Sequence, residues 1–180
     1  MDVAMGSSLT KERAKFAFYT KPYRKELVKL FVKKGMAEKI KLEKLADITK
    51  TDYMIGVEGG YFYGKNYQQL IQNADFRTHI SEVIDIEQNV TMLLKGHLDG
   101  FLVDPITMKA FTEKYSLQGE FEVHDVEVYQ ADIHIMLSKK SCNEKTLIKF
   151  NQAIDTLNAS GKLTEILNKW TLIQKLAVAK

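Results

Sequence analysis

Two side chains of opposite charge, Arg13 and Asp104, each lie beside a predicted helix start and could together bind a small charged molecule. A guanidinium is a planar fork of hydrogen-bond donors that matches a carboxylate, and an aspartate is a natural acceptor for an ammonium group. A ligand that carries both a carboxylate and an ammonium needs one partner of each kind. Arg13 and Asp104 are therefore the candidate pair for a small zwitterion.

Both residues also have a purely structural interpretation. Thr10 is a suitable helix N-cap with Glu12 in the first turn. Arg13 is therefore either a ligand-binding group near the N–H groups of a helix start or a solvated helix arginine that pairs with Glu12 or another neighbour. Asp104 precedes Pro105, and Asp followed by Pro is a good helix N-cap. A cap at the mouth of a cleft can still accept from an ammonium, so the two interpretations of Asp104 are compatible.

The elements that must position these residues alternate between strands and helices. Runs rich in Val, Ile, Leu, Phe and Tyr predict strands at Asp2–Met5, Leu27–Val32, Tyr53–Val57, Gly100–Val103 and Ile133–Leu137. Apolar stripes predict helices through Tyr67, Leu70 and Ile71, through Val90, Leu93 and Leu94, and through Leu147, Ile148, Phe150, Ile154 and Leu157, with Gly161 closing the last. This alternation indicates the α/β class.

Composition and motifs exclude several other classes of protein. The 26 Lys and Arg residues barely outnumber the 23 Asp and Glu residues and are interspersed with them, so no nucleic-acid partner is expected. Cys142 is the only cysteine, and the opening residues lack the basic and apolar regions of an export signal. The sequence also has no G-x-S-x-G, P-loop or G-x-G-x-x-G motif. The histidines are not paired at ligand spacing, so neither a metal nor a cofactor is expected; these are His79, His97, His124 and His134.

Four segments, in order, resemble the type 2 periplasmic solute-binding proteins of family 3, which are the amino-acid-binding components of ABC transporters. The segments are Gly6–Arg13 with Tyr19–Tyr23, Ile55–Gly60, Leu94–Asp104, and the closing stretch Asn151–Leu157, Gly161–Leu163, Ile166 and Lys169-Trp170. Each segment alone is a weak signal, but their order and spacing together are specific.

The resemblance implies two α/β lobes that close around a ligand, a permease in the membrane as partner, and a periplasmic location. The first lobe is expected to comprise residues 1–30 and 136–180, the second residues 36–128, and the crossing strands to lie near 27–33 and 131–137. Such proteins normally begin with a further strand–helix–strand region. We therefore expect the first lobe to be incomplete, with weak affinity for ligand and self-association through its uncovered surface.

The resemblance also assigns roles to single residues. It implies that Arg13, helped by Ser8, takes the ligand carboxylate, that Gly6 and Gly60 make backbone contacts, and that Asp104 takes the ammonium. Glycines are equally common in ordinary turns. Gly59-Gly60 ahead of a helix would let backbone N–H groups approach an anion, but a single Gly-Gly pair is more often only a turn.

The sequence departs from the family pattern at Tyr61-Phe62-Tyr63, where Ser, Thr or Gly is usual. These rings either stack on a flat or cationic ligand, with Tyr61 and Phe62 in the site, or fill a hydrophobic gap between strand and helix. Glu58 is a possible anionic contact. The same residue is the candidate acid or base if the chain is instead an enzyme similar to cyclohexadienyl dehydratase. A detached sensory domain is the third possibility.

Overall fold

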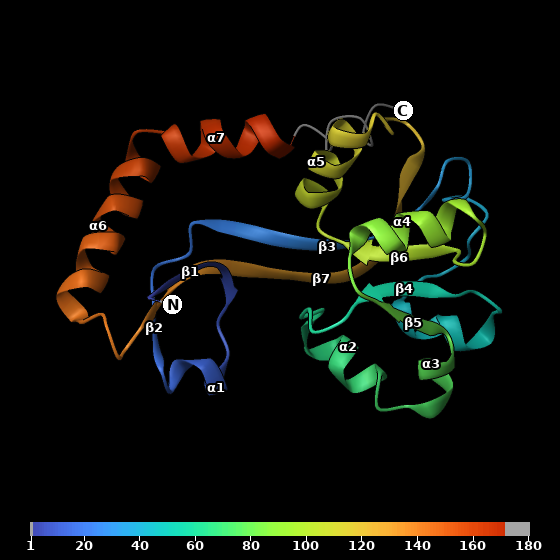
Figure 1. Ribbon diagram of the computed structural model, residues 1–180, viewed down its shortest axis with the longest axis horizontal. Helices are drawn as coiled ribbons and strands as arrows, with labels where there is room; N and C mark the ends of the chain where they lie inside the picture. Colours follow the sequence, from blue (N-terminus) through green and yellow to red (C-terminus); the bar gives the residue numbers. More distant parts are fainter. Residues whose placement is uncertain (1, 172–180) are drawn as a thin grey trace. The chain divides into compact units, whose positions relative to one another are not determined.

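The computed structural model describes residues 2–171, apart from the side chains of Trp170 and Thr171. Over this range the chain forms two compact units, one containing residues 2–26 and 131–171 and the other residues 27–130 (Figure 1). We call them the first and second units. The predicted first lobe also includes residues 1 and 172–180, which lie outside the described part.

Strands and helices alternate along the chain, as predicted for an α/β protein. The strands are β1 (Val3–Ser8), β2 (Ala17–Tyr19), β3 (Arg24–Lys33), β4 (Ile55–Glu58), β5 (Ile80–Val83), β6 (Gly100–Val103) and β7 (Phe121–Ser138). The helices are α1 (Lys11–Ala14), the 3-10 helix η1 (Leu45–Lys50), α2 (Gly64–Leu70), α3 (Ala74–Thr78), α4 (Ile86–Leu94), α5 (Pro105–Tyr115), α6 (Glu144–Ala159) and α7 (Lys162–Thr171). Strands β3 and β7 each contribute residues to both units.

The second unit is a mixed sheet with the strand order β7-β3-β6-β4-β5. Strand β3 runs antiparallel to β6, whereas β4 is parallel to both β6 and β5. Because parallel strands end at the same edge, the segments that follow β4, β5 and β6 all start from one edge of this sheet.

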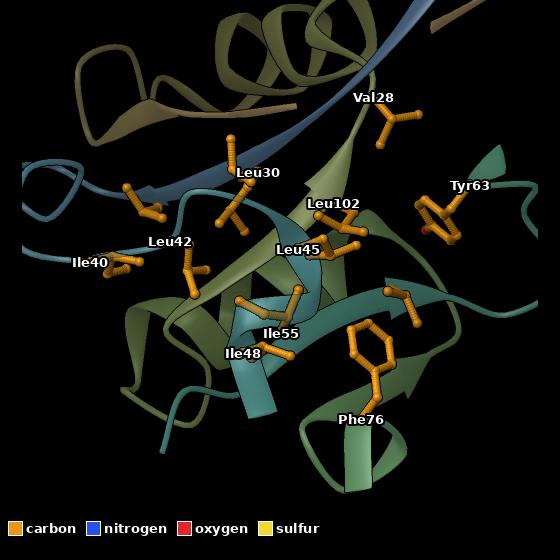
Figure 2. Close-up of a cluster of buried hydrophobic side chains, with 13 residues drawn as sticks. Val28, Leu30, Ile40, Leu42, Leu45, Ile48, Ile55, Tyr63, Phe76 and Leu102 are labelled. Atoms are coloured by element: carbon orange, nitrogen blue, oxygen red, sulfur yellow. The ribbon is translucent and has the colours of Figure 1, made fainter. Parts of the chain in front are cut away.

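Both faces of this sheet are covered, because its strands alternate apolar side chains between them. In β6, Leu102 belongs to a cluster with residues of η1 and α3, while Phe101 and Val103 pack with residues of α4 and α5. Figure 2 shows the first of these clusters, with Leu45 and Ile48 of η1 near Leu102 and Ile55. The alternation explains why all four residues of β6 are buried.

The first unit is built around the end of β7. Strands β1 and β2 both pair antiparallel with residues 133–138 of this strand. Ile133, Ile135 and Leu137 of β7 are buried. The loop after β2 is joined to α6 by Lys21, whose backbone N–H donates to the Asn151 side chain at 2.7 Å and whose ammonium pairs with Asp155. These bonds tie α6 to the strand pair.

Several strand predictions were incomplete. Strand β7 begins at Phe121, whereas only Ile133–Leu137 was predicted as strand, and neither β2 nor β5 was predicted. The first part of β7 carries an alternating pattern that indicates a strand, since His124 and Val126 are buried and Asp125 and Glu127 are exposed. Strands β2 and β5 have three and four residues, too few for periodicity to identify.

His124 connects β7 to the segment before η1 through a buried hydrogen-bond pair. Its Nδ1 accepts from the Val126 backbone N–H at 3.0 Å, so the proton is on Nε2, which donates to the Ile40 carbonyl at 2.8 Å. Both backbone partners would be left unpaired in a dry environment if the ring were removed.

We therefore expect His124→Ala to lower the free energy of unfolding by about 2–4 kcal/mol, because two buried backbone groups lose their partner. Urea denaturation at pH 7 measures this change. The exposed His97 supplies the control, and His97→Ala is expected to change stability by less than about 0.5 kcal/mol. Equal losses in the two variants would contradict the proposed role of the His124 hydrogen bonds.

Candidate functional site

Arg13 lies in the short helix α1 of the first unit, with its guanidinium turned back toward the end of β1. Thr10 caps the helix as predicted, since its hydroxyl accepts from the Arg13 backbone N–H at 3.2 Å. The Arg13 Nη1 donates to the Ser8 carbonyl at 3.4 Å. Within the described part of the chain, half-buried Arg13 forms no ion pair, and the alternative pairing with Glu12 is not seen. Its remaining donors are thus not matched by a carboxylate of the described chain.

Tyr19 is a neighbour of this arginine that sequence reasoning did not single out. Its hydroxyl lies 3.5 Å from the Ser8 carbonyl, to which it donates. Burial raises the pKa of the Tyr19 hydroxyl, and the nearby Arg13 charge partly opposes that rise. Tyr19 therefore stays a neutral donor and holds the carbonyl that Arg13 also contacts. Tyr19 is the first residue of the Tyr19–Tyr23 motif, and this position was the feature of the sequence that could have identified it as a neighbour of the site.

Gly6 and Ser8 lie on the same strand as this carbonyl. Gly6 has a φ of 72°, within a register shift between Ala4 and Ser7, and only glycine adopts this backbone without cost. Its N–H donates to the Tyr23 hydroxyl at 3.1 Å. Ser8 is buried at the strand end. The structure thus brings Ser8 and Arg13 together. The positive φ at residue 6 is sufficient to account for the glycine at that position.

In the second unit, the aromatic run after β4 divides into three different environments. Tyr63 is buried, and its hydroxyl accepts from the Glu58 backbone N–H at 2.7 Å. Phe62 is half-buried and meets the Tyr129 ring edge-on with centroids 5.4 Å apart. Tyr61 is 40% exposed and packs against Tyr63, with centroids 5.0 Å apart. Tyr63 fills the gap between strand and helix, whereas Tyr61 presents a ring to solvent.

The turn that leads into this run is formed by Glu58–Tyr61. The Tyr61 backbone N–H donates to the Glu58 carbonyl at 3.3 Å, and Gly60 has a φ of 75° at an exposed position. The turn conformation alone therefore accounts for Gly60. Its N–H remains a predicted ligand contact.

Asp104 follows β6 and begins α5, as its sequence context predicted. Its Oδ1 accepts from the backbone N–H groups of Ile106 at 2.7 Å and Thr107 at 3.3 Å, and the residue is buried. Parallel pairing of β4 with β6 places Asp104 at the same sheet edge as the Glu58–Tyr61 turn. The structure thus brings Asp104, Gly60, Tyr61 and Phe62 to one edge of the second unit.

Besides Asp104, three further carboxylates lie at this edge, and of these three sequence reasoning had named only Glu58. Glu58 ends β4, Asp85 caps α4, and the Glu82 side chain lies where a side chain on residue 59 would project. Burial raises the pKa of the Glu58 carboxyl, and the Asp85 charge raises it further. Burial also raises the pKa of Tyr67 to about 12, with the Glu82 charge adding to the effect. Carboxylates from β4, β5, α4 and α5 therefore gather at this edge.

Comparisons with known proteins identify the class. Residues 1–173 match the bacterial extracellular solute-binding proteins, family 3, and the chain belongs to this family. The resemblance seen in the motifs is thereby confirmed.

Solved structures with this fold include three amino-acid-binding proteins. An ancestral arginine-binding protein bound to arginine has a TM-score of 0.73 and 21% identity, with 95% of this chain and 72% of that chain covered. The substrate-binding protein AbpA of Streptococcus pneumoniae, bound to L-arginine, has a TM-score of 0.73 and 21% identity, with 93% and 67% covered. The arginine-, lysine-, histidine-binding protein ArtJ of Geobacillus stearothermophilus has a TM-score of 0.69 and 20% identity, with 95% and 70% covered.

These similarities confirm the predicted α/β fold of the periplasmic-binding-protein type 2 class. A comparison with curated protein sequences gave no match. Across the described residues, no helix has both the length and the apolar character needed to cross a membrane.

Glu58 gives a test of the electrostatics of this edge. Its pKa is raised in the folded chain, so the folded state holds the Glu58 proton more tightly than the unfolded state does. That stabilising contribution is complete below the unfolded-state pKa and is lost as the pH rises through the folded-state pKa. At neutral pH the ionised side chain is therefore unfavourable for folding.

We expect Glu58→Gln to raise the free energy of unfolding at pH 7 by less than about 1 kcal/mol, because Glu58 is only partly buried. The gain should shrink as the pH falls toward 4. Thermal unfolding over this pH range measures it, and Glu38→Gln, at an exposed position, is the control. A loss of stability at pH 7 in Glu58→Gln would contradict the expected sign.

Proposed function

We propose that this solute-binding protein binds an amino acid or a similar small zwitterion and delivers it to an ABC permease in the membrane. The observation that carries the proposal is the state of Arg13, which is half-buried and has no carboxylate partner in the described chain. A partly desolvated guanidinium that has no anionic partner gains a strong charge-assisted hydrogen bond when an anion binds to it. A ligand carboxylate would do so.

The second charge of the ligand is assigned to the second unit. Asp104 is buried, and its Oδ1 is committed to the cap of α5. Asp104 places a carboxylate at the sheet edge, and we assign this group to the ligand ammonium. Under this proposal Arg13 and Ser8 bind the carboxylate, Gly6 and Gly60 contribute backbone groups, and Asp104 binds the ammonium.

The similar proteins support an amino acid as the ligand class. Two of the structures contain bound arginine, and a third protein is described as binding arginine, lysine and histidine. Family membership supports the permease as partner and an extracytoplasmic location.

We also propose that residues 1–30 with 136–180 act as one lobe and residues 36–128 as the other. The division of the chain into two compact units supports this, as does the passage of β3 and β7 through both. A ligand that contacts both lobes would favour the closed state by its higher affinity for it. No covalent step is needed.

Elimination chemistry is the second candidate function, and one observation favours it. The raised pKa of Glu58 is a property that a general acid requires. Mixing the chain with prephenate or arogenate and following the ultraviolet absorbance tests this directly, because turnover changes the spectrum and simple binding leaves the substrate intact.

We expect Arg13→Ala and Asp104→Asn each to weaken amino-acid binding by about 2 kcal/mol or more, roughly 30-fold, because each leaves a ligand charge unpaired. Asp104→Asn is chosen because the amide oxygen can still cap α5 while the charge is lost. Calorimetric titration with millimolar ligand measures the change in affinity.

Arg77→Ala removes an exposed arginine on α3 and is the control. Its affinity should match that of the parent. If Arg13→Ala and Asp104→Asn also bind as tightly as the parent, the assignment of these two residues to the ligand is wrong.

A further inference from the structure

We infer that Lys139 is a positioning residue for ligand binding: its ammonium holds the C-terminal end of α1 and thereby sets where Arg13 presents its guanidinium. The inference rests on the proposed function, which assigns the ligand carboxylate to Arg13. Lys139 is given no contact with the ligand. It acts on the affinity through the helix that carries Arg13.

Helix α1 is not fixed by packing in a core. It has four residues, and none of them is buried. A single helical turn is also unstable in isolation, because forming the first turn orders several residues and gains only one hydrogen bond. Bonds to residues outside the turn must therefore fix α1, and with it Arg13.

The two ends of α1 are held by different residues. At the N-terminal end, the Thr10 hydroxyl accepts from the Arg13 backbone N–H. At the C-terminal end, the Lys139 ammonium donates to the Ala14 carbonyl at 2.6 Å and to the Lys15 carbonyl at 3.4 Å. Carbonyl groups at the end of a helix lack partners within the helix and carry its partial negative charge, so a lysine at this place is favourable.

Lys139 is held at both its backbone and its ammonium. Its backbone N–H donates to the Phe16 carbonyl at 3.0 Å, next to the pairing of Ala17 with Ser138 between β2 and β7. The ammonium lies over the ring of Phe18, 5.4 Å from the ring centroid. An exposed lysine usually contributes little, because ordering its long side chain costs entropy. Here the additional contacts limit the freedom of the side chain, so its bonds to α1 cost less to form.

The bonds of Lys139 connect α1 to the end of β7, because Lys139 directly follows this strand. Strand β7 also pairs with β1, whose Ser8 carbonyl accepts from Arg13 Nη1. Both the helix that carries Arg13 and the carbonyl that its guanidinium contacts are thus fixed to one strand. Without the Lys139 bonds, α1 can move while the Ser8 carbonyl stays in place. The guanidinium would then lose its alignment with the end of β1.

Lys139→Met tests the inference, because methionine keeps an unbranched side chain and removes the ammonium. L-arginine and L-glutamine are the probes, since they share the α-carboxylate and differ in their side chains. We expect Lys139→Met to weaken the binding of both by about threefold or more in calorimetric titrations. The loss should be equal for the two probes, because it operates through the carboxylate that they share.

A double-mutant cycle separates positioning from a general structural effect. If Lys139 acts through Arg13, Lys139→Met should change the affinity by less than about 1.5-fold when Arg13→Ala is already present. Lys139→Arg keeps a cation at the end of α1 and should stay within about twofold of the parent affinity. Circular dichroism checks that each variant is folded.

Lys140→Met is the matched control. Lys140 is the next residue and is also exposed, but its ammonium forms no hydrogen bond or ion pair within residues 2–171. Its replacement should leave the affinity for both probes unchanged.

Amide hydrogen exchange tests the same bonds without a ligand. The N–H groups of Ala14 and Phe16 close the helical turn by donating to the carbonyls of Thr10 and Arg13 at 3.0 and 3.1 Å. Lys139→Met should speed the exchange of these two N–H groups by about threefold or more, because the turn opens more often. The control variant should leave their exchange unchanged.

The outcomes separate the inference from the proposed function. Unchanged affinity in Lys139→Met, an equal loss with and without Arg13, or unchanged amide exchange would overturn the inference and leave the proposed function intact. Failure of the parent chain to bind L-arginine, L-glutamine or any other amino acid would overturn the proposed function and, with it, the role of Lys139 in binding. The exchange measurement would still decide whether Lys139 holds α1.

Discussion

Parallel pairing of β4 with β5 and β6 is the constraint on which the chemistry of the second unit depends. Because the three strands point the same way, the residues that follow them meet at one edge, although 46 positions separate Glu58 from Asp104 along the chain. The backbone groups beyond this edge are no longer held by the sheet, so they can form turns and helix starts. Asp85 and Asp104 both use their side chains to cap such helices.

Close packing above β4 is what keeps this edge in place. Gly56 lies in the middle of β4, and a side chain there would overlap Asn89 and Leu98. The missing side chain allows α4 to approach the strand closely, as glycine does where an element must come near a backbone. The opposite face of β4 is filled by Ile55 and Val57 in the larger apolar cluster. The turn after β4 therefore starts from a strand that is fixed on both faces.

Some of this arrangement was readable from the sequence because it is encoded locally. A helix cap depends on two or three consecutive residues, so Thr10 and Asp104 were identified correctly. The family motifs were also local, and they gave the fold class. The contacts that sequence reasoning missed are non-local. Glu82 reaches Gly59 only through the pairing of β5 with β4, and a strand of four residues carries too little pattern to reveal that pairing.

The aromatic run is a second case in which the sequence did not reveal the environment of each side chain. Sequence reasoning treated Tyr61-Phe62-Tyr63 as one feature with two rival interpretations, a ligand surface or a hydrophobic plug. The structure assigns the plug to Tyr63, whose ring is buried and whose hydroxyl finds the Glu58 N–H, and it leaves Tyr61 partly exposed.

The two interpretations of the run were therefore not exclusive. A buried tyrosine needs a partner for its hydroxyl, and the backbone of Glu58 provides one at the end of β4. That bond fixes the tyrosine against which Tyr61 packs, and it does so at the residue whose carboxylate gives the turn its charge. Glu58 thus takes part in both arrangements: its backbone N–H fixes the buried Tyr63, and its carboxylate contributes charge at the exposed edge. A shift of the backbone at Glu58 would therefore alter the core packing and the edge together.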